Sequence, residues 1–265
     1  MSWDCPFLIS FRRKGVSSAT ASTSAMTTPQ KIMRRLLSKV TQRVCRGYAH
    51  CEGRLMPPKM TARPFVPPRP TLATARAAAA ACRGCDLWRR ATQTVFGAGP
   101  AHAAVVLVGE QPGDEEDRAG TPFVGPAGRV LDRALAEAGI ERSAIYVTNT
   151  VKHFSWEPRG KRRIHKKPRV SEIAACHPWL ETELALIKPR AVVCLGATAT
   201  LALLGADVKV MRDRGKLLES TLAPIVMTTV HPSSILRART DDERAEAMKA
   251  FVRDLKTVAN RLGRR

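Results

Sequence analysis

The chain has 265 residues, enough for one large α/β domain or two small ones, and its 44 Lys and Arg against 23 Asp and Glu give a formal net charge of +21. This charge favours a polyanionic partner, with nucleic acid the first candidate and an anionic membrane surface, or solubility alone, the alternatives. Because no apolar run approaches the roughly 20 residues of a membrane-spanning helix, and the seven cysteines are irregularly spaced, the sequence argues against an integral membrane protein and a secreted disulfide framework.

Residues 1–70 are predicted to form a basic, disordered extension, because they lack sustained apolar periodicity and end in the proline-rich run at 63–70. Residues 1–59 contain eleven Lys and Arg against two acidic residues, a net charge of +9, which leaves +12 for the remainder. Their Arg- and Ser-rich composition resembles an organelle transit peptide. A start codon assigned too far upstream, with Met56 or Met60 as the true first residue, explains the same composition, and we favour this explanation.

From residue 71 onwards the sequence alternates between helices and strands. Short apolar runs predict strands, and longer stretches with one apolar face predict helices. The expected helices are 71–81, 126–138, 171–187, 197–204 and 241–262, and the expected strands are 104–108, 145–148, 191–195 and 225–230. Because this alternation is typical of a parallel sheet covered on both faces, we predict one α/β domain over residues 71–265, with three αβα layers and a central four-stranded parallel sheet.

Three loops of this domain follow the carboxyl ends of strands, where ligands collect in parallel α/β sheets. Their sequences are GEQPGD at 109–114 with PFVGPAG at 122–128, NTVKH at 149–153, and HPSS at 231–234. The loops supply one carboxylate, one aromatic ring, one amide and one imidazole, from Glu110, Phe123, Asn149 and His231. Each alone has an ordinary explanation: a surface acid, a core residue, a turn residue and a helix cap. Four such groups at equivalent strand ends predict a shared site.

These motifs resemble the uracil-DNA glycosylase superfamily, in its iron–sulfur branch of families 4 and 5, over roughly residues 82–262. The resemblance implies that a uracil flipped out of the DNA base stack is bound by Gln111, Phe123, Asn149 and His231. Phe123 would stack on the base and Asn149 would read its Watson–Crick edge. His231 would stabilise the departing uracil anion, and Glu110 would stabilise positive charge at C1′ or activate a nucleophile.

The residues that follow His231 are the expected contact with the DNA backbone. The resemblance implies that Ser233, Ser234 and Arg237 lie against the phosphates. Ile235 or Leu236 would then act as an apolar wedge between bases.

Cys82 and Cys85 form a CxxC pair, which on its own fits a zinc knuckle or two unused thiols as well as a cluster. The resemblance implies that this pair and two later ligands hold a [4Fe-4S] cluster that pins the DNA-binding loops. Cys176 matches the fourth ligand position, and His153 stands at the third, where most family members have a cysteine. An imidazole can replace a thiolate on iron, as in Rieske centres, and a three-cysteine cluster with a labile iron is the alternative.

The interval of 23 positions from His153 to Cys176 is longer than in family 4 and contains the run KRRIH at 161–165. Taken alone, this run predicts a phosphate-binding surface loop. With its flanking motifs it resembles the loop of UdgX-type proteins, whose histidine becomes covalently joined to the sugar after uracil leaves. We expect Lys161, Arg162 and Arg163 to contact DNA, the two arginines also to position His165, and the surrounding cations to lower the pKa of His165.

The sequence therefore predicts a DNA repair protein that excises uracil once and stays attached to the abasic sugar through His165, with Glu110 and His231 as the other catalytic residues. A conventional turnover family 4 glycosylase and a non-catalytic iron–sulfur DNA-binding module are the alternatives. We expect a monomer that acts on uracil-containing DNA, single-stranded in preference, without binding a membrane, at the nucleoid of a bacterial cytoplasm. Organelle targeting by residues 1–59 stays open as an alternative.

Overall fold

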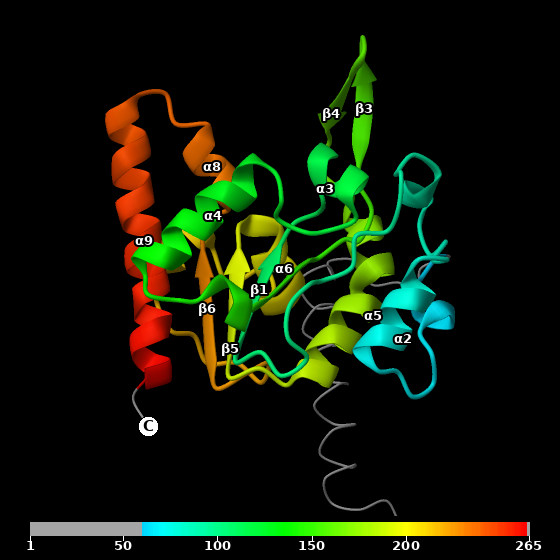
Figure 1. Ribbon diagram of the computed structural model, residues 1–265, viewed down its shortest axis with the longest axis horizontal. Helices are drawn as coiled ribbons and strands as arrows, with labels where there is room; N and C mark the ends of the chain where they lie inside the picture. Colours follow the sequence, from blue (N-terminus) through cyan, green and yellow to red (C-terminus); the bar gives the residue numbers. More distant parts are fainter. Residues whose placement is uncertain (1–59, 264–265) are drawn as a thin grey trace, which may run out of the picture.

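The computed structural model describes residues 60–263, and its centre is a sheet of four parallel strands in the order β2-β1-β5-β6 (Figure 1). The strands are β1 (Val105–Gly109), β2 (Tyr146–Asn149), β5 (Ala191–Leu195) and β6 (Ile225–Thr229). Every residue of the four strands is buried, as expected of a parallel sheet with both faces covered. The predicted sheet is therefore confirmed.

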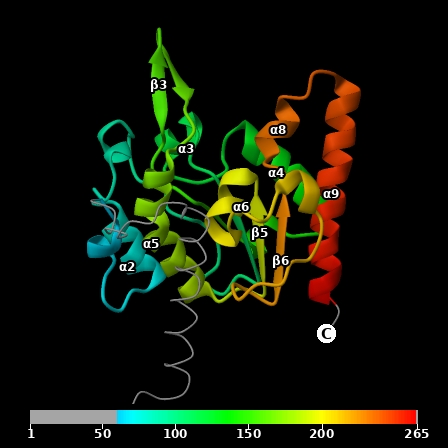
Figure 2. The same ribbon diagram turned by 180° about the vertical axis from the view of Figure 1, so that it is seen from behind.

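Helices form the two outer layers of the fold. The helices of one layer are α4 (Pro126–Glu137) and α9 (Asp241–Gly263), and those of the other are α5 (Val170–Ile187) and α6 (Ala197–Leu204). Leu107 packs in the core under α4 and α9, whereas its neighbour Val106 packs in the core under α5 and α6, because successive strand residues point to opposite faces. Figures 1 and 2 show these two layers from opposite sides.

Short elements connect the layers. They are η1 (Arg63–Phe65), α2 (Leu72–Ala79), η2 (Asp86–Arg89), α3 (Asp114–Ala119), η3 (Arg142–Ala144), α7 (Val210–Asp213) and α8 (Pro232–Leu236). Each predicted helix and strand agrees with the observed bounds to within two residues, whereas α3, α7 and α8 were not predicted. Among residues 60–263, no helix is both long and apolar enough to cross a bilayer.

A hairpin of two antiparallel strands, β3 (Trp156–Arg159) and β4 (Arg162–His165), projects beyond the carboxyl ends of the sheet (Figure 1). The sequence predicted a loop here. Gly160 closes the hairpin with a φ of 58°, in the left-handed region that favours glycine. Because alternate strand residues share a face, Arg163 and His165 lie on one side of β4. His165 is therefore held by a strand.

The described residues before α2 fold against the body, although the sequence predicted disorder through residue 70. Ala62 is buried, and its N–H donates a hydrogen bond to Ala175 O at 2.8 Å. Phe65 packs against the core that contains Trp179. The prediction of disorder was wrong for residues 60–70, because their apolar side chains anchor the proline-rich run on α5, and residues 1–59 lie outside the described part of the chain.

Candidate active site

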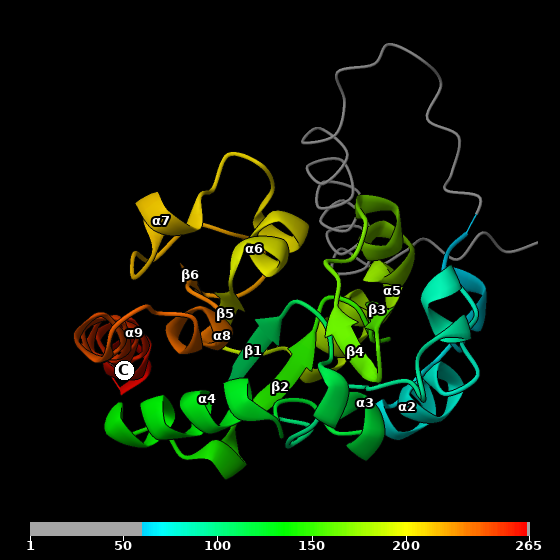
Figure 3. The ribbon, with the colours of Figure 1, turned by 90° about the horizontal axis from the view of Figure 1, so that it is seen from above.

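The carboxyl ends of the sheet open into a cavity of about 940 Å³, the active-site cavity. This volume suits a ligand of nucleoside size. It is lined by the ends of β2 and β5, the loops after β1 and β6, α6, α7 and the β3–β4 hairpin. Figure 3 shows the arrangement of these elements in the fold. Its lining includes all the residues predicted for uracil binding and catalysis, Glu110, Gln111, Phe123, Asn149, His165 and His231.

Asn149, at the end of β2, lines the cavity and carries an unpaired acceptor. Its side chain is buried, and its Oδ1 has no hydrogen-bond partner among the described residues. A buried acceptor without a partner is costly unless a ligand supplies the donor. A Cβ on Gly109 would fall 2.4 Å from this Oδ1 and 2.7 Å from the Phe123 ring, so glycine is required beside them. Phe123 itself has a φ of 58°, a strained conformation that functional sites often hold.

His231 presents a neutral N–H donor beside this amide. Its Nδ1 accepts from the Ser233 main-chain N–H at 3.2 Å, so the ring proton is on Nε2. Burial, with the positive charges of Arg237 and His165, lowers the pKa of His231 to about 4. The ring lies 6.1 Å from the Phe123 ring at an interplanar angle of 29°. An uncharged imidazole in this position can donate to an oxygen on which negative charge develops.

Glu110 and His165 face each other across the cavity. The Nε2 of His165 lies 3.6 Å from Glu110 Oε1, and the other carboxylate oxygen, Oε2, accepts a hydrogen bond from the Thr198 hydroxyl. Thr198 lies in the first turn of α6 and was not predicted, because a threonine beside a helix start carries no distinguishing signal in the sequence. Gly196, directly before α6, allows His231 to pack closely against it, because a Cβ at this position would lie 2.9 Å from His231 Cβ.

The pKa of His165 is lowered from its ordinary value, as predicted, but for a different main reason. Partial burial of the ring, whose side chain is still 49 % exposed, is the largest cause; the Glu110 carboxylate opposes it and the Arg237 cation adds to it. The cations of the KRRIH run were expected to lower this pKa, but they are not among its main causes, because Lys161 and Arg162 are exposed to solvent. A ring that stays neutral keeps a lone pair for nucleophilic attack.

Arg163 fixes the hairpin to the body. Its guanidinium donates to Asp114 and, at 2.6 Å, to Asp117 Oδ2, and it lies over the rings of Phe154 and Trp156. The Asp117 side chain is fully buried. We expected Arg163 to contact DNA, but these carboxylates occupy its guanidinium, so its place in the structure is that of an anchor for β4.

Gln111 also serves the hairpin, although the sequence predicted that it binds uracil. Its Nε2 donates to the carbonyls of Ser155 and Lys166 at 3.1 Å each, and its Oε1 accepts from Ser155 N at 3.1 Å. The amide thereby joins the two ends of the hairpin. Gln111 lines the active-site cavity, but both ends of its amide are engaged with the protein.

The other residues predicted to contact DNA lie around the mouth of the cavity. Lys161 and Arg162 are exposed at the turn end of the hairpin. Ser233, Ser234 and Arg237 belong to the α8 region, where Arg237 donates to Ser233 Oγ at 3.1 Å. Of the two wedge candidates, Leu236 is 41 % exposed and Ile235 is buried in the core, so only Leu236 is available to DNA.

A buried ion pair connects Asn149 with the cysteine region. Lys152 Nζ donates to Glu183 Oε2 at 2.5 Å and to the Asn149 carbonyl at 2.7 Å, with both charged side chains inaccessible to solvent. The main-chain N–H of Lys152 donates to Cys176 Sγ at 3.2 Å. Sequence patterns did not indicate Glu183, which lies in the C-terminal half of α5. This pair holds the loop after β2 against α5.

Cys82, Cys85 and Cys176 share one small core beside α5. Trp179 Nε1 donates to Cys82 Sγ at 3.2 Å, and hydrogen bonds of this kind to sulfur are typical around iron–sulfur clusters. Burial raises the pKa of Cys85 to about 11 and that of Cys176 to about 12. A bound cation would be needed to hold these sulfurs as thiolates.

The hydrogen bonding of His153 resembles that of a metal-ligating histidine, in which one ring nitrogen is a donor and the other keeps its lone pair. Its Nε2 lies 2.9 Å from Thr94 Oγ1, whose own hydrogen goes to the Ala79 carbonyl, so Nε2 is the donor and Nδ1 keeps a lone pair. Among residues 60–263, no three Cys, His, Asp or Glu side chains close around a single metal ion. Three cysteine sulfurs and one imidazole nitrogen are donor types found in both zinc and iron–sulfur sites.

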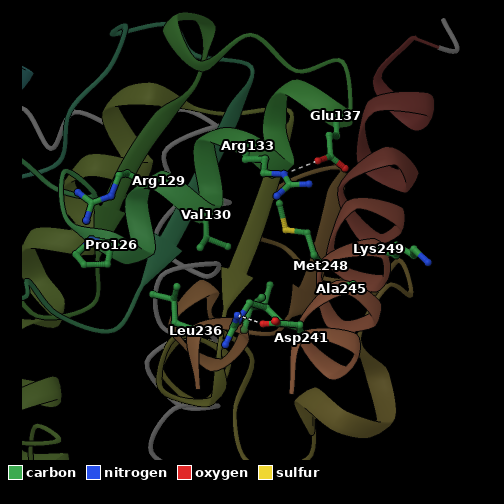
Figure 4. A pocket seen from close by; sticks show the side chains of 12 residues that line it. Pro126, Arg129, Val130, Arg133, Glu137, Leu236, Asp241, Ala245, Met248 and Lys249 are labelled. Atoms are coloured by element: carbon green, nitrogen blue, oxygen red, sulfur yellow. Dashed lines mark hydrogen bonds and ion pairs between the residues drawn. The ribbon is translucent and has the colours of Figure 1, made fainter. Parts of the chain in front are cut away.

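A second groove, of about 620 Å³, lies between α4, α8 and α9 (Figure 4). Its floor is apolar, with Val130 and Met248, and its rim carries charged side chains. Arg133 pairs with Glu137 at 2.8 Å, and Arg244 pairs with Asp241. The groove lining carries four cations, Arg129, Arg133, Arg244 and Lys249, against two acids, but it includes none of the residues predicted for uracil binding or catalysis.

The family model described as the uracil DNA glycosylase superfamily matches residues 96–256. The chain is 36% identical to a Type-4 uracil-DNA glycosylase of Thermotoga maritima over 179 residues, covering 65% of this chain and 90% of that protein. It is 35% identical to a Type-4 uracil-DNA glycosylase of Pyrobaculum aerophilum over 163 residues, covering 59% and 80%. A Type-4 uracil-DNA glycosylase of Archaeoglobus fulgidus is 32% identical over 191 residues, covering 69% and 89%.

Proposed function

Because the chain belongs to the uracil-DNA glycosylase superfamily, we propose that it recognises uracil in DNA, excises it and stays covalently bound to the abasic sugar through His165. The position of the His165 ring carries this proposal. Its Nε2 faces Glu110 at 3.6 Å inside the cavity that also contains Phe123, Asn149 and His231. Lys161 and Arg162 of the same run, by contrast, do not line this cavity.

Three side chains account for recognition of the base. The unpaired Oδ1 of Asn149 would accept the N3–H of uracil, a hydrogen that cytosine lacks. Phe123 would stack on the ring, and the Nε2–H of His231 would donate to O2. A site with a buried acceptor rejects a base without the matching donor, because the acceptor would stay unpaired.

Excision breaks the bond between C1′ of the sugar and N1 of uracil, and the electron pair leaves with the base. His231 stabilises the uracil anion through O2, and the Glu110 carboxylate stabilises the positive charge that develops at C1′. His231 does not need to change its protonation state in this step, because its pKa is already lowered to about 4 by burial and by the charges of Arg237 and His165.

Capture follows when the Nε2 lone pair of His165 forms a bond to C1′. A neutral imidazole becomes an alkylated imidazolium while uracil departs as an anion, so charge is conserved. The Glu110 carboxylate faces the new cation. Because an imidazole joined to the sugar is a poor leaving group, the protein would remain on the DNA after one turnover.

The DNA strand would lie between the hairpin and α8. Lys161 and Arg162 on one side, and Ser233, Ser234 and Arg237 on the other, would contact phosphates, with Leu236 as the wedge. We propose single-stranded DNA as the preferred substrate, because extrusion of a base costs least where it is unpaired. We propose a monomer as the active form, because all six residues predicted for uracil binding and catalysis meet within a single chain.

Cys82, Cys85, Cys176 and the Nδ1 of His153 would hold a [4Fe-4S] cluster. The hydrogen bonds to Cys82 and Cys176 sulfurs and the donor role of His153 Nε2 support this ligand set. When bound, the cluster would cross-link the chain before β1, the loop after β2 and α5. Its role would be structural, since Lys152 connects this region to the Asn149 loop.

Denaturing gel electrophoresis with labelled single-stranded DNA containing one uracil tests the proposal. A heat-stable band of slower mobility is expected with the wild-type protein, and peptide mass spectrometry should locate the linkage on His165. His165→Ser should abolish the band, whereas His102→Ser, at an exposed histidine outside the cavity, should leave it unchanged. An adduct that persists in His165→Ser would overturn the assignment.

A turnover uracil-DNA glycosylase is the second candidate, supported by the similarity to the Type-4 enzymes. In this reading Glu110 would activate a water, which attacks C1′ in place of His165. The same gel distinguishes the two candidates, because abasic product in molar excess over the protein would indicate turnover.

A further inference from the structure

Thr198 is a buried residue whose hydroxyl points at the catalytic carboxylate. Its side chain is only 3 % exposed, and among the described residues Glu110 Oε2 is the only hydrogen-bond partner of its hydroxyl. A buried valine would fill the same volume without a hydroxyl that must be satisfied. The buried hydroxyl therefore indicates that Thr198 has a role beyond packing.

The two oxygens of Glu110 face different groups. Oε2 accepts from Thr198, which leaves Oε1 directed at His165 Nε2. The Glu110 side chain is 23 % exposed, so the carboxylate would be able to rotate towards water in the cavity without this hydrogen bond. Thr198 lies in the first turn of α6, where the helix dipole also favours a carboxylate.

We propose that Thr198 is a positioning residue that fixes the Glu110 carboxylate towards His165 and thereby favours capture by His165 over attack by water. This inference rests on the proposed covalent function. In both reactions the C1′–N1 bond breaks and the electron pair leaves with uracil. In capture the His165 lone pair forms the new bond, whereas in hydrolysis a water oxygen forms it and Glu110 accepts the water proton.

The orientation of one carboxylate thus decides between the two outcomes. Held by Thr198, Oε1 stabilises the imidazolium that forms as His165 bonds to C1′. Released, the carboxylate is free to accept a hydrogen bond from water and to act as its general base. The product ratio of abasic DNA to covalent adduct measures this choice directly.

Thr198→Val, which removes the hydroxyl and keeps the shape, is the main test. Loss of a hydrogen bond to a charged group corresponds to a roughly tenfold to hundredfold slower rate of adduct formation. The ratio of free abasic product to adduct should rise as well. Thr198→Ser restores the hydroxyl and should return the rate to within about threefold of wild type and restore the product ratio.

Thr200→Val is the matched control. Thr200 is a buried threonine on the same helix, and its hydroxyl donates to the Gly196 carbonyl at 2.8 Å without touching Glu110. This variant should lower thermal stability but leave the adduct rate and the product ratio unchanged. Melting temperatures of all three variants show whether each is folded.

The outcomes separate this inference from the proposed function. If the wild-type protein forms neither adduct nor abasic product, the proposed function fails. If the wild type forms adduct and a folded Thr198→Val protein matches it in rate and product ratio, only the role of Thr198 is overturned. The same conclusion follows if Thr200→Val shifts the ratio as strongly as Thr198→Val, or if Thr198→Ser does not restore it.

Discussion

Arg163→Met should both destabilise the protein and slow its reaction with DNA. Methionine keeps an apolar stem against Phe154 and Trp156 but removes the charge that faces Asp114 and Asp117. The Asp117 carboxylate would then be a buried anion without a cation. Because His165 lies two residues further along the same strand, a loosened β4 would also misplace the nucleophile.

The size of the effect follows from the surroundings of Asp117. Removal of one partner from a buried ion pair costs about 3–5 kcal/mol. Two features reduce this value: Thr92 N continues to donate to both Asp117 oxygens at 3.0 Å, and the Arg163 side chain is itself 16 % exposed. We expect a loss of about 2–3 kcal/mol, which lowers the melting temperature of a domain of this size by about 4–12 °C.

Arg162→Met is the matched control for this experiment, because Arg162 is the neighbouring residue on β4 and is exposed. It should change stability by less than about 0.5 kcal/mol, yet weaken DNA binding and reduce its dependence on salt. Thermal unfolding and the rate of adduct formation are measured for both variants. Equal melting temperatures for Arg163→Met and Arg162→Met would contradict this prediction, because Arg163 would then not hold the hairpin.

Three further predictions concern the pocket, pH and the cysteines. Gly109→Ala places a methyl group 2.4 Å from Asn149 Oδ1 and should reduce uracil excision at least about tenfold, and a normal excision rate on the labelled DNA would contradict the assigned pocket. Between the ordinary pKa of 6.5 and the folded-state pKa of about 4, His231 binds a proton only in the unfolded chain. The free energy of unfolding should therefore fall as pH is lowered through this window, and urea titrations should show a shallower fall in His231→Gln. Elemental analysis should find about four irons per chain, and fewer in Cys176→Ser, whereas stoichiometric zinc without iron would exclude the cluster.

The sequence predicted the pocket well because of a topological constraint. In a parallel sheet the carboxyl ends of neighbouring strands lie at one edge, so Glu110, Asn149 and His231 had to converge once the strands were located. Short apolar runs between the predicted helices located those strands to within two residues. The requirement for glycine at position 109 could not be predicted in this way, because it is evident only when Asn149 and Phe123 are seen to lie beside Gly109.

The hairpin was not predictable from the same patterns. Its strands are short and mostly exposed, and a run of cations has no apolar alternation from which to infer a strand. Arg163 and Arg162 are identical neighbours in the sequence, yet one is an internal anchor and the other is in solvent. The difference arises from tertiary contacts with α3, which local sequence does not encode. Thr198 is similar, since its partner Glu110 is 88 positions away.

The loop after β1 connects the two chemical functions of the site. Within five consecutive positions, Glu110 faces His165, Gln111 joins the ends of the hairpin, and Asp114 pairs with Arg163. The same short loop therefore sets the position of the carboxylate and that of the histidine relative to it. Because capture requires both groups to meet one carbon atom, an error of about 1 Å in either would slow it severely. Changes in this loop should thus affect capture more than they affect base recognition, which depends on Phe123 and Asn149.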